Sequence, residues 1–449
     1  MSFAPLTTRL VRLYRSVARL LFPMATRARG AAVCAVALCA FAGAARPACA
    51  VAESSLQQVQ TADAPEPGSN LRVFLMTLGP GDLVYEFFGH NGIVIRDNRT
   101  GSDLFYNWGV FSFDEPGYIR KFIQGRMTYW MEPWPTEAVV EGYRQMNRSV
   151  YLQELNLTNE QKVALQDFLI WNAQPDNKFY RYDYYRDNCS TRVRDALDRA
   201  LGGILRAQLD TPSGETYRTE TQRLSYRDIL MYTGLMIGLG PLTDQPLTKW
   251  DDGFIPLRLR EWVREVTVTD ENGVQRPLVA VDATIFEADR PATAERAPFL
   301  LPYYIIAGLI LAAVFLLLGR WAVRSGTGRI VFGILATVFT FVTGLLGVLL
   351  AFLWAFTDHE VAYRNENLFQ LNPLALALMV TIIVMLFRKE WASRAAMLSI
   401  VVGGFAFLGF LLQLYPGFQQ ANGEVIALFM PANIALAWVL GKMRPRVEA

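Results

Sequence analysis

The stretch YDYYRDNCSTRVRDAL, residues 182–197, places a single thiol at the start of what we predict to be an amphipathic helix. Apolar side chains recur at helical spacing after Cys189, and Gly202-Gly203 supplies a stop. The side-chain oxygen of Asp187 or Asn188 can cap the first turn. Cys189 then lies on the apolar stripe of the helix, which is expected to face a sheet.

A thiol in the first turn of a helix has a chemical consequence. The positive end of the helix dipole, together with Arg186 and Arg192, favours the thiolate over the thiol. The N–H groups of the same turn can hold a developing oxyanion. We therefore predict that Cys189 is a nucleophile. The competing interpretation is a small core hydrophobe, the usual role of a lone cysteine.

The N-terminal 50 residues predict an export signal, because an arginine-rich start is followed by the apolar run GAAVCAVALCAFAGAA and by small residues at signal-peptidase spacing. We expect cleavage after Ala50 or Ala52. A retained N-terminal anchor is disfavoured because the apolar run is short for a membrane span. A lipid-modified Cys49 is disfavoured because no lipobox precedes this cysteine. All cysteines except Cys189 lie in this leader. An unpaired thiol in an oxidising compartment is a liability unless it is used.

The C-terminal part, residues 300–441, is expected to be an all-α transmembrane domain. Its apolar runs approach the length that crosses a bilayer, and they lie at about 301–319, 330–356, 373–387, 396–414 and 425–441. Lysine and arginine follow the first, third and fifth runs, so the positive-inside rule predicts a cytoplasmic tail at 442–449 and an N-terminal domain on the opposite side. The net charge of only +2 gives no basic field for nucleic acid.

The exported part is expected to divide into three segments. Residues 51–70 are polar and predict a disordered linker. Residues 71–203 predict a compact α+β domain with strands at 71–77, 90–97 and 103–110, followed by a helix that a Thr158–Gln161 capping box starts. Residues 204–299 predict an accessory segment with a β-hairpin at Asn272-Gly273, which we expect between the domain and the membrane.

The thiolate needs a base, and His90 is the only histidine of the exported domain. A third polar group usually fixes the imidazole tautomer, and we predict Asn107 for it. Tyr106, Asp97 and Glu86 remain alternatives, because the sequence does not fix the strand register. One Cys and one His are too few for the usual zinc sites, so neither a metal nor a cofactor is expected.

Two groups of polar residues have open roles. Arg120, Lys121 and Arg126 can meet a phospholipid headgroup, although a solvated basic face is the plainer interpretation. His359 lies in the polar loop TDHEVAYRNEN at the end of the second span, where it is either interfacial or part of a substrate entry.

Several ordered motifs resemble one known family over residues 71–203: PGDLVYEFFGHNGIVIRD, FYNWGVFSFDEPGYIRKFIQGRMTYW, LNLTNEQKVAL and FYRYDYYRDNCSTRVRDAL. They resemble the Lnb N-terminal periplasmic domain family, and the multi-span region resembles that of Lnb-type lipoprotein N-acyltransferases. The resemblance implies a permuted papain-like α+β domain, related to lecithin retinol acyltransferase, in which the histidine precedes the cysteine. His90 and Cys189 have that order, but the second histidine that is often the third member is missing.

The implied activity is thiol acyl transfer at the bacterial inner membrane. Cys189 would take an acyl chain from a membrane phospholipid and pass it to the N-terminal amine of a lipoprotein, the family's acceptor. Two other classes stay open: a periplasmic Cys/His hydrolase of peptide, amide or lipid ester bonds, and a non-catalytic binding module held at the membrane.

Overall fold

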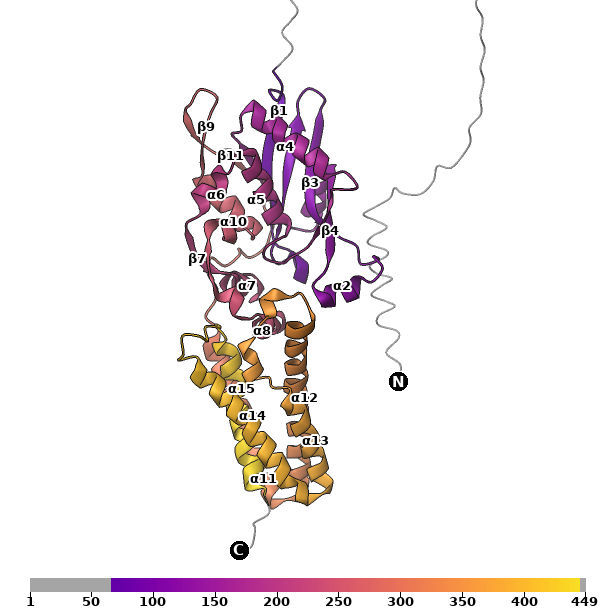
Figure 1. The fold of residues 1–449 in the computed structure, drawn as a ribbon, viewed down its shortest axis with the longest axis vertical. Coiled ribbons are helices and arrows are strands. Elements are labelled where there is room, and N and C mark those ends of the chain that lie inside the picture. The colour runs from indigo at the N-terminus through magenta and orange to yellow at the C-terminus, as the bar shows by residue number, and fades with distance from the viewer. Residues whose placement is uncertain (1–65, 445–449) are drawn as a thin grey trace, which may run out of the picture. The chain divides into compact units, whose positions relative to one another are not determined.

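The structure is a computed structural model that describes residues 66–444, all of which belong to one compact unit (Figure 1). The predicted export signal lies outside the described residues, as do most of the linker and the end of the tail. Residues 66–70, which we expected in the disordered linker, form a turn in which Asn70 donates a hydrogen bond to Asp97. The ordered domain therefore begins before residue 71.

A seven-stranded antiparallel sheet organises the N-terminal domain, with strand order β11-β5-β1-β2-β3-β4-β6. Its strands are β1 (Leu71–Leu78), β2 (His90–Asp97), β3 (Ser102–Val110), β4 (Thr128–Pro135), β5 (Val150–Leu155), β6 (Phe179–Arg181) and β11 (Val279–Phe286). Two two-stranded sheets pair β7 (Pro212–Thr216) with β8 (Pro246–Thr248), and β9 (Thr267–Thr269) with β10 (Gln275–Pro277).

Helices cover both faces of the main sheet. Those of the N-terminal domain are α2 (Tyr118–Gln124), α3 (Thr136–Gln145), α4 (Asn159–Asn172), α5 (Cys189–Ala200), α6 (Ile204–Leu209), α7 (Tyr217–Ser225), α8 (Ile229–Gly238), α9 (Lys249–Asp252) and α10 (Pro256–Trp262). β1 is nearly continuously apolar because it is buried on both sides. Val73 and Leu75 join a core with α4, α5, α6 and α10, whereas Phe74 and Met76 pack with α3.

Residues 204–299, expected as an accessory segment, contribute to the same fold. Leu205, Leu259 and Leu278 belong to the core on the α5 face of the sheet, and β11 forms its edge beside β5. The hairpin predicted around Asn272-Gly273 is confirmed as β9 and β10, but its predicted place is wrong. Glu271 at its turn accepts a hydrogen bond from the backbone N–H of Asn159, so the hairpin lies at the start of α4 and not between domain and membrane (Figure 1).

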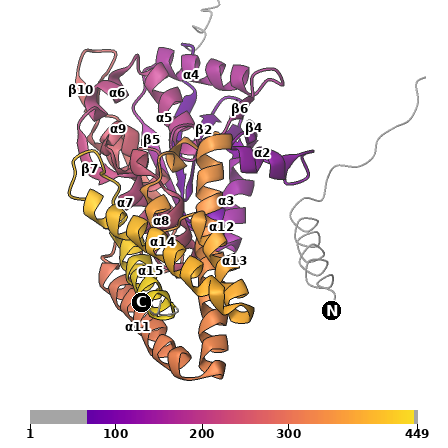
Figure 2. The same ribbon diagram turned by 60° about the horizontal axis from the view of Figure 1, so that its bottom comes forward.

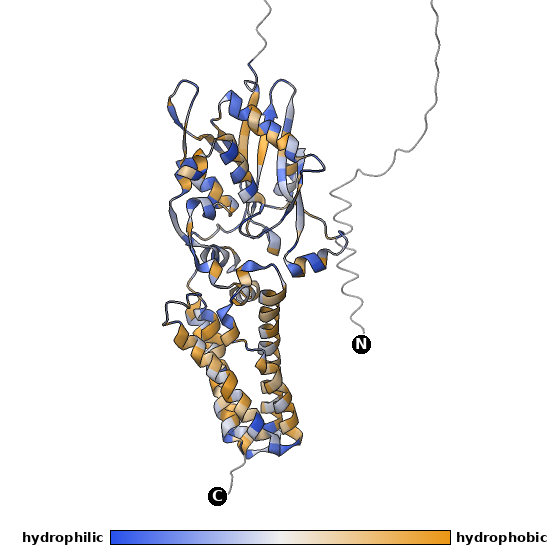
Figure 3. Ribbon diagram, in the orientation of Figure 1, coloured by the Kyte–Doolittle hydropathy of each residue, from blue (hydrophilic) through white to orange (hydrophobic). Residues whose placement is uncertain are grey.

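The C-terminal part consists of five apolar helices, which confirms the predicted transmembrane domain. They are α11 (Leu301–Arg324), α12 (Gly326–Phe356), α13 (Leu374–Phe387), α14 (Ala392–Leu412) and α15 (Gly423–Lys442). α13 alone is short for a span, but the apolar segment continues back to Glu366 through a 3-10 turn. Figure 3 shows these helices as largely hydrophobic, in contrast to the mixture of hydrophilic and hydrophobic residues in the sheet domain. The α+β domain followed by a multi-span helical domain is the predicted fold class.

Candidate functional site

The predicted nucleophile lies at the first residue of a well-capped helix. α5 begins at Cys189, and the Asn188 side chain caps it by accepting hydrogen bonds from the N–H groups of Ser190 (2.8 Å) and Thr191 (3.0 Å). Asn188 is thus the cap, of the two residues that the sequence allowed. The cap therefore engages two of the N–H groups that the sequence predicted as oxyanion donors.

His90 and Asn107 are neighbours on adjacent strands. His90 is the first residue of β2, and its Nε2 lies 2.6 Å from Oδ1 of Asn107 on β3. An amide oxygen can only accept, so the imidazole Nε2–H donates and Nδ1 is left to receive the thiol proton. Asn107 is buried, whereas His90 and Cys189 are each partly accessible.

His90 and Cys189 influence each other's protonation. Burial alone would raise the pKa of Cys189, but the charge and hydrogen bond of His90, with the N–H groups of Asn91 and Ser190, lower it. Burial alone would lower the pKa of His90, but the charge and hydrogen bond of Cys189, followed by the Asn107 hydrogen bond, raise it. The pair therefore favours thiolate and imidazolium, the reactive state of a cysteine nucleophile.

The arginines that we expected to assist the thiolate are engaged elsewhere. Arg186 pairs with Glu360 (2.8 Å), and Arg192 pairs with Asp187. The three alternatives to Asn107 are also occupied in other contacts: Glu86 pairs with Arg148, Asp97 accepts from Asn70, and Tyr106 lies in the core on the opposite side of β3.

Gly109 allows the side chains of His90 and Cys189 to approach each other, and sequence reasoning missed it. It has a φ of 104°, where L side chains are strained, and lies at an irregularity in the β3–β4 pairing. A Cβ there would lie 3.4 Å from Cε1 of His90 and 3.6 Å from Cβ of Cys189. A glycine inside the strand DLFYNWGV was the available signal, since such glycines often mark bulges or close approaches.

Arg148 is a second residue that sequence reasoning missed. It is buried, donates to the carbonyl of Gly79 (2.9 Å) and lies over the Tyr143 ring. Its charge opposes the rise in the pKa of His90. No local pattern marks this residue, because its role depends on packing between distant segments.

The sheet domain is joined to the transmembrane domain near this site. Asp358, two residues after α12, accepts a hydrogen bond from Arg126 (2.7 Å) and forms an ion pair with Arg181 (3.0 Å). His359 donates through Nε2 to the carbonyl of Phe122 (2.9 Å) and stacks on Tyr184. Of the three basic residues considered for a headgroup, Lys121 pairs with Glu115, Arg126 pairs with Asp358, and Arg120 is exposed.

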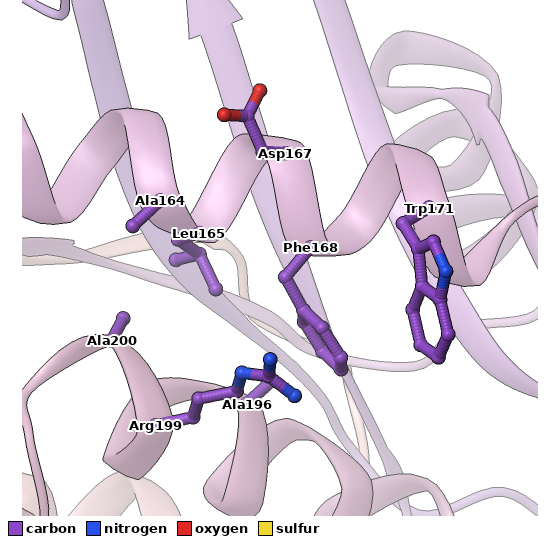
Figure 4. Close-up of a pocket in the computed structure, with 8 residues that line it drawn as sticks. All are labelled: Ala164, Leu165, Asp167, Phe168, Trp171, Ala196, Arg199 and Ala200. Carbon is purple, nitrogen blue, oxygen red and sulfur yellow. The ribbon is translucent and has the colours of Figure 1, made fainter.

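A cavity of about 400 Å³ lies elsewhere, between α4 and α5 (Figure 4). Phe168, Trp171 and Arg199 are among its lining residues, and Cys189, His90 and Asn107 are not. The Arg199 guanidinium lies 4.8 Å from the centre of the Phe168 ring. This cation–π contact gives Arg199 a packing role, so its charge does not indicate a ligand in the cavity. Within residues 66–444 no group of three or more Cys, His, Asp or Glu side chains could hold a metal ion.

Two family models match the chain in the order of its two domains. The model described as the Lnb N-terminal periplasmic domain matches residues 57–224, and the model described as the Lnb transmembrane domain matches residues 294–439. No curated protein and no solved structure matches the chain.

Proposed function

Because this chain is an Lnb-type protein of the inner membrane, with a periplasmic and a transmembrane domain, we propose that it is a thiol acyltransferase acting on lipoproteins. Cys189 is the nucleophile, His90 the base and Asn107 the group that orients His90. The observation that supports this most is the contact of His90 Nε2 with Asn107, which leaves Nδ1 for the thiol.

The first half-reaction forms a thioester. The Cys189 thiolate attacks an ester carbonyl of a phospholipid, and the resulting oxyanion collapses as the C–O bond breaks. The imidazolium of His90 gives its proton to the departing lysophospholipid oxygen. His90 is then neutral, and the acyl chain is attached to sulfur.

The second half-reaction passes the chain to nitrogen. The N-terminal amine of a lipoprotein attacks the thioester carbonyl, His90 removes one proton from that amine, and the C–S bond breaks. An amide forms, and the Cys189 thiolate with protonated His90 is regenerated. A membrane-held site suits this chemistry, because both substrates diffuse in the same leaflet.

The proposal is tested by the N-termini of lipoproteins in cells. Mass spectrometry should find N-acylated lipoprotein termini in cells with this gene and free amines in cells without it. A Cys189→Ser chain should not restore acylation, while the wild-type chain should. Unchanged acylation in the deletion strain would contradict the proposal and favour a hydrolase at the same Cys/His site.

A further inference from the structure

The short helix α2 has an unusual apolar face. Ile119, Phe122 and Ile123 follow the i, i+3, i+4 spacing and lie on one side of the helix, yet they are 73%, 47% and 45% exposed. Figure 3 shows hydrophilic and hydrophobic residues together along α2. An apolar face of this kind points to contact with something other than water.

The position of α2 relative to the spanning helices indicates what that contact is. The N–H of Asp358 donates to the carbonyl of Gln124 (2.9 Å), the last residue of α2. Asp358 follows Phe356, the last residue of the spanning helix α12, by two positions. The end of α2 is therefore hydrogen-bonded to the loop that directly follows a candidate membrane span, beside the end of α12 that faces the sheet domain (Figures 1 and 2).

A second short helix with exposed apolar residues lies beside the ends of two other spans. α8 is a short apolar helix in which Ile229 and Leu230 are exposed. It is held to the ends of two other spans, because Tyr232 donates to Glu424 of α15 (2.7 Å) and Thr233 hydrogen-bonds with Tyr304 of α11 (2.6 Å). The exposed apolar side chains of α2 and α8 therefore lie beside those ends of α11, α12 and α15 that face the sheet domain.

An aromatic strip connects α2 with the nucleophile. The ring of Phe111 stacks on Tyr118 of α2 (6.2 Å between centroids) and on Tyr129 (4.9 Å), and Tyr129 stacks on Tyr182 (4.1 Å). These rings are only partly buried. The strip leads toward the start of α5, because Asp183, the residue after Tyr182, pairs with Asp187 (3.0 Å from N to O), two positions before Cys189.

We propose that the apolar face of α2 inserts into the outer leaflet of the membrane and that the aromatic strip leads a phospholipid acyl chain from that leaflet to Cys189. The leaflet itself is the partner, and Arg120 beside the apolar face can meet its headgroups. The path to Cys189 rests on the proposed acyl transfer, whereas the insertion of α2 does not.

Insertion is measured with a depth-sensitive fluorophore. A full-length chain with its four cysteines changed to serine receives one cysteine at Ile119 or Ile123, labelled with NBD, and is reconstituted into phosphatidylethanolamine–phosphatidylglycerol vesicles. A doxyl-labelled lipid should quench both positions severalfold more than Ile170→Cys on the helix α4, a residue as exposed as Ile123 that lies away from the spans (Figure 1). Val338→Cys within α12 is the positive control. Quenching at Ile119 no stronger than at Ile170 would overturn the insertion and point to a protein partner.

The path is measured separately, in chains that keep Cys189. Ile119→Asp with Ile123→Asp should lower acyl transfer from vesicle phospholipid by roughly ten- to a hundredfold, while Ile119→Leu with Ile123→Leu retains it. The rate of Cys189 alkylation by iodoacetamide should be the same in both variants, which shows that the site is folded. Normal transfer by the aspartate variant would overturn the path. If wild-type protein transfers nothing, the proposed function fails, and the quenching result still decides whether α2 inserts.

Discussion

At the scale of single residues, the property that matters most is the protonation state of His90 and Cys189. Burial opposes charge on both groups, yet the pKa of Cys189 is lowered and that of His90 is raised. The thiolate–imidazolium pair therefore forms as pH rises through the lowered pKa of Cys189. It is lost as pH rises further, through the raised pKa of His90, because the imidazolium then loses its proton.

The pH dependence of Cys189 alkylation tests this pairing. As pH rises, the thiolate should form below the pH at which a free cysteine ionises. In His90→Ala only the N–H groups of Asn91 and Ser190 still oppose the burial that raises the pKa of Cys189, so the inflection should move to higher pH. Iodoacetamide rates followed by mass spectrometry give both curves. Identical inflections in the two proteins would contradict the ion pair.

Asn107 should act through His90. Asn107→Ala removes the acceptor for Nε2, so acyl transfer should fall roughly ten- to a hundredfold through loss of the imidazole orientation. The hydrogen bond also helps to raise the pKa of His90, so the alkaline limb of the pH–rate profile should move to lower pH. Asn156→Ala is the control, because Asn156 donates to Pro277 at the sheet edge. An unshifted profile in Asn107→Ala would contradict a positioning role.

At the scale of elements, α5 holds the thiol in place through its cap. Asn188→Ala should destabilise the protein by about 1 kcal/mol through loss of the cap, and should also slow Cys189 alkylation. Thr158→Ala is the matched control, because Thr158 caps α4 with the same kind of bond and lies away from the thiol. It should lower the thermal midpoint to a similar extent and leave alkylation unchanged. Equal alkylation in the two variants would contradict a role of the cap at the site.

The sequence predicts those elements whose signals are local. The cap and periodicity of α5, the Thr158–Gln161 box of α4 and the start of β2 at His90 each depend on neighbouring residues, and they were predicted correctly. The Asn107 contact depends on the register between β2 and β3, so Tyr106 and two carboxylates remained alternatives. The place of the β9–β10 hairpin depends on long-range packing, and its prediction was wrong.

At the scale of the whole molecule, the loop after α12 joins the two domains near the site. Asp358 binds Arg126 and Arg181 of the sheet domain, and Arg126 is the main cause that lowers the pKa of Asp358. The sequence marked this loop as polar, but Arg126 and Arg186, the partners of Asp358 and Glu360, are more than 150 positions away in the chain, so local patterns do not identify them.

Asp358→Ala should loosen the junction between the loop after α12 and the sheet domain without altering the chemistry. We expect acyl transfer from vesicle phospholipid to fall severalfold because the site is held less firmly against the leaflet, while Cys189 alkylation stays unchanged. The wild-type junction should likewise weaken as pH falls through the lowered pKa of Asp358. Asp82→Ala is the control, since it removes an exposed ion pair with Arg290 that lies within the sheet domain. Equal transfer by both variants would contradict a role for the junction.

The central claim is that Cys189 becomes acylated, and trapping the intermediate tests it most directly. Full-length protein in vesicles is incubated with a phospholipid labelled in its acyl chain, without acceptor, and is then digested and mapped by mass spectrometry. We predict a label on the peptide that contains Cys189, released by neutral hydroxylamine and absent from Cys189→Ser. A protein that releases labelled fatty acid or transfers it to lipoproteins with no hydroxylamine-sensitive label on Cys189 would contradict the account.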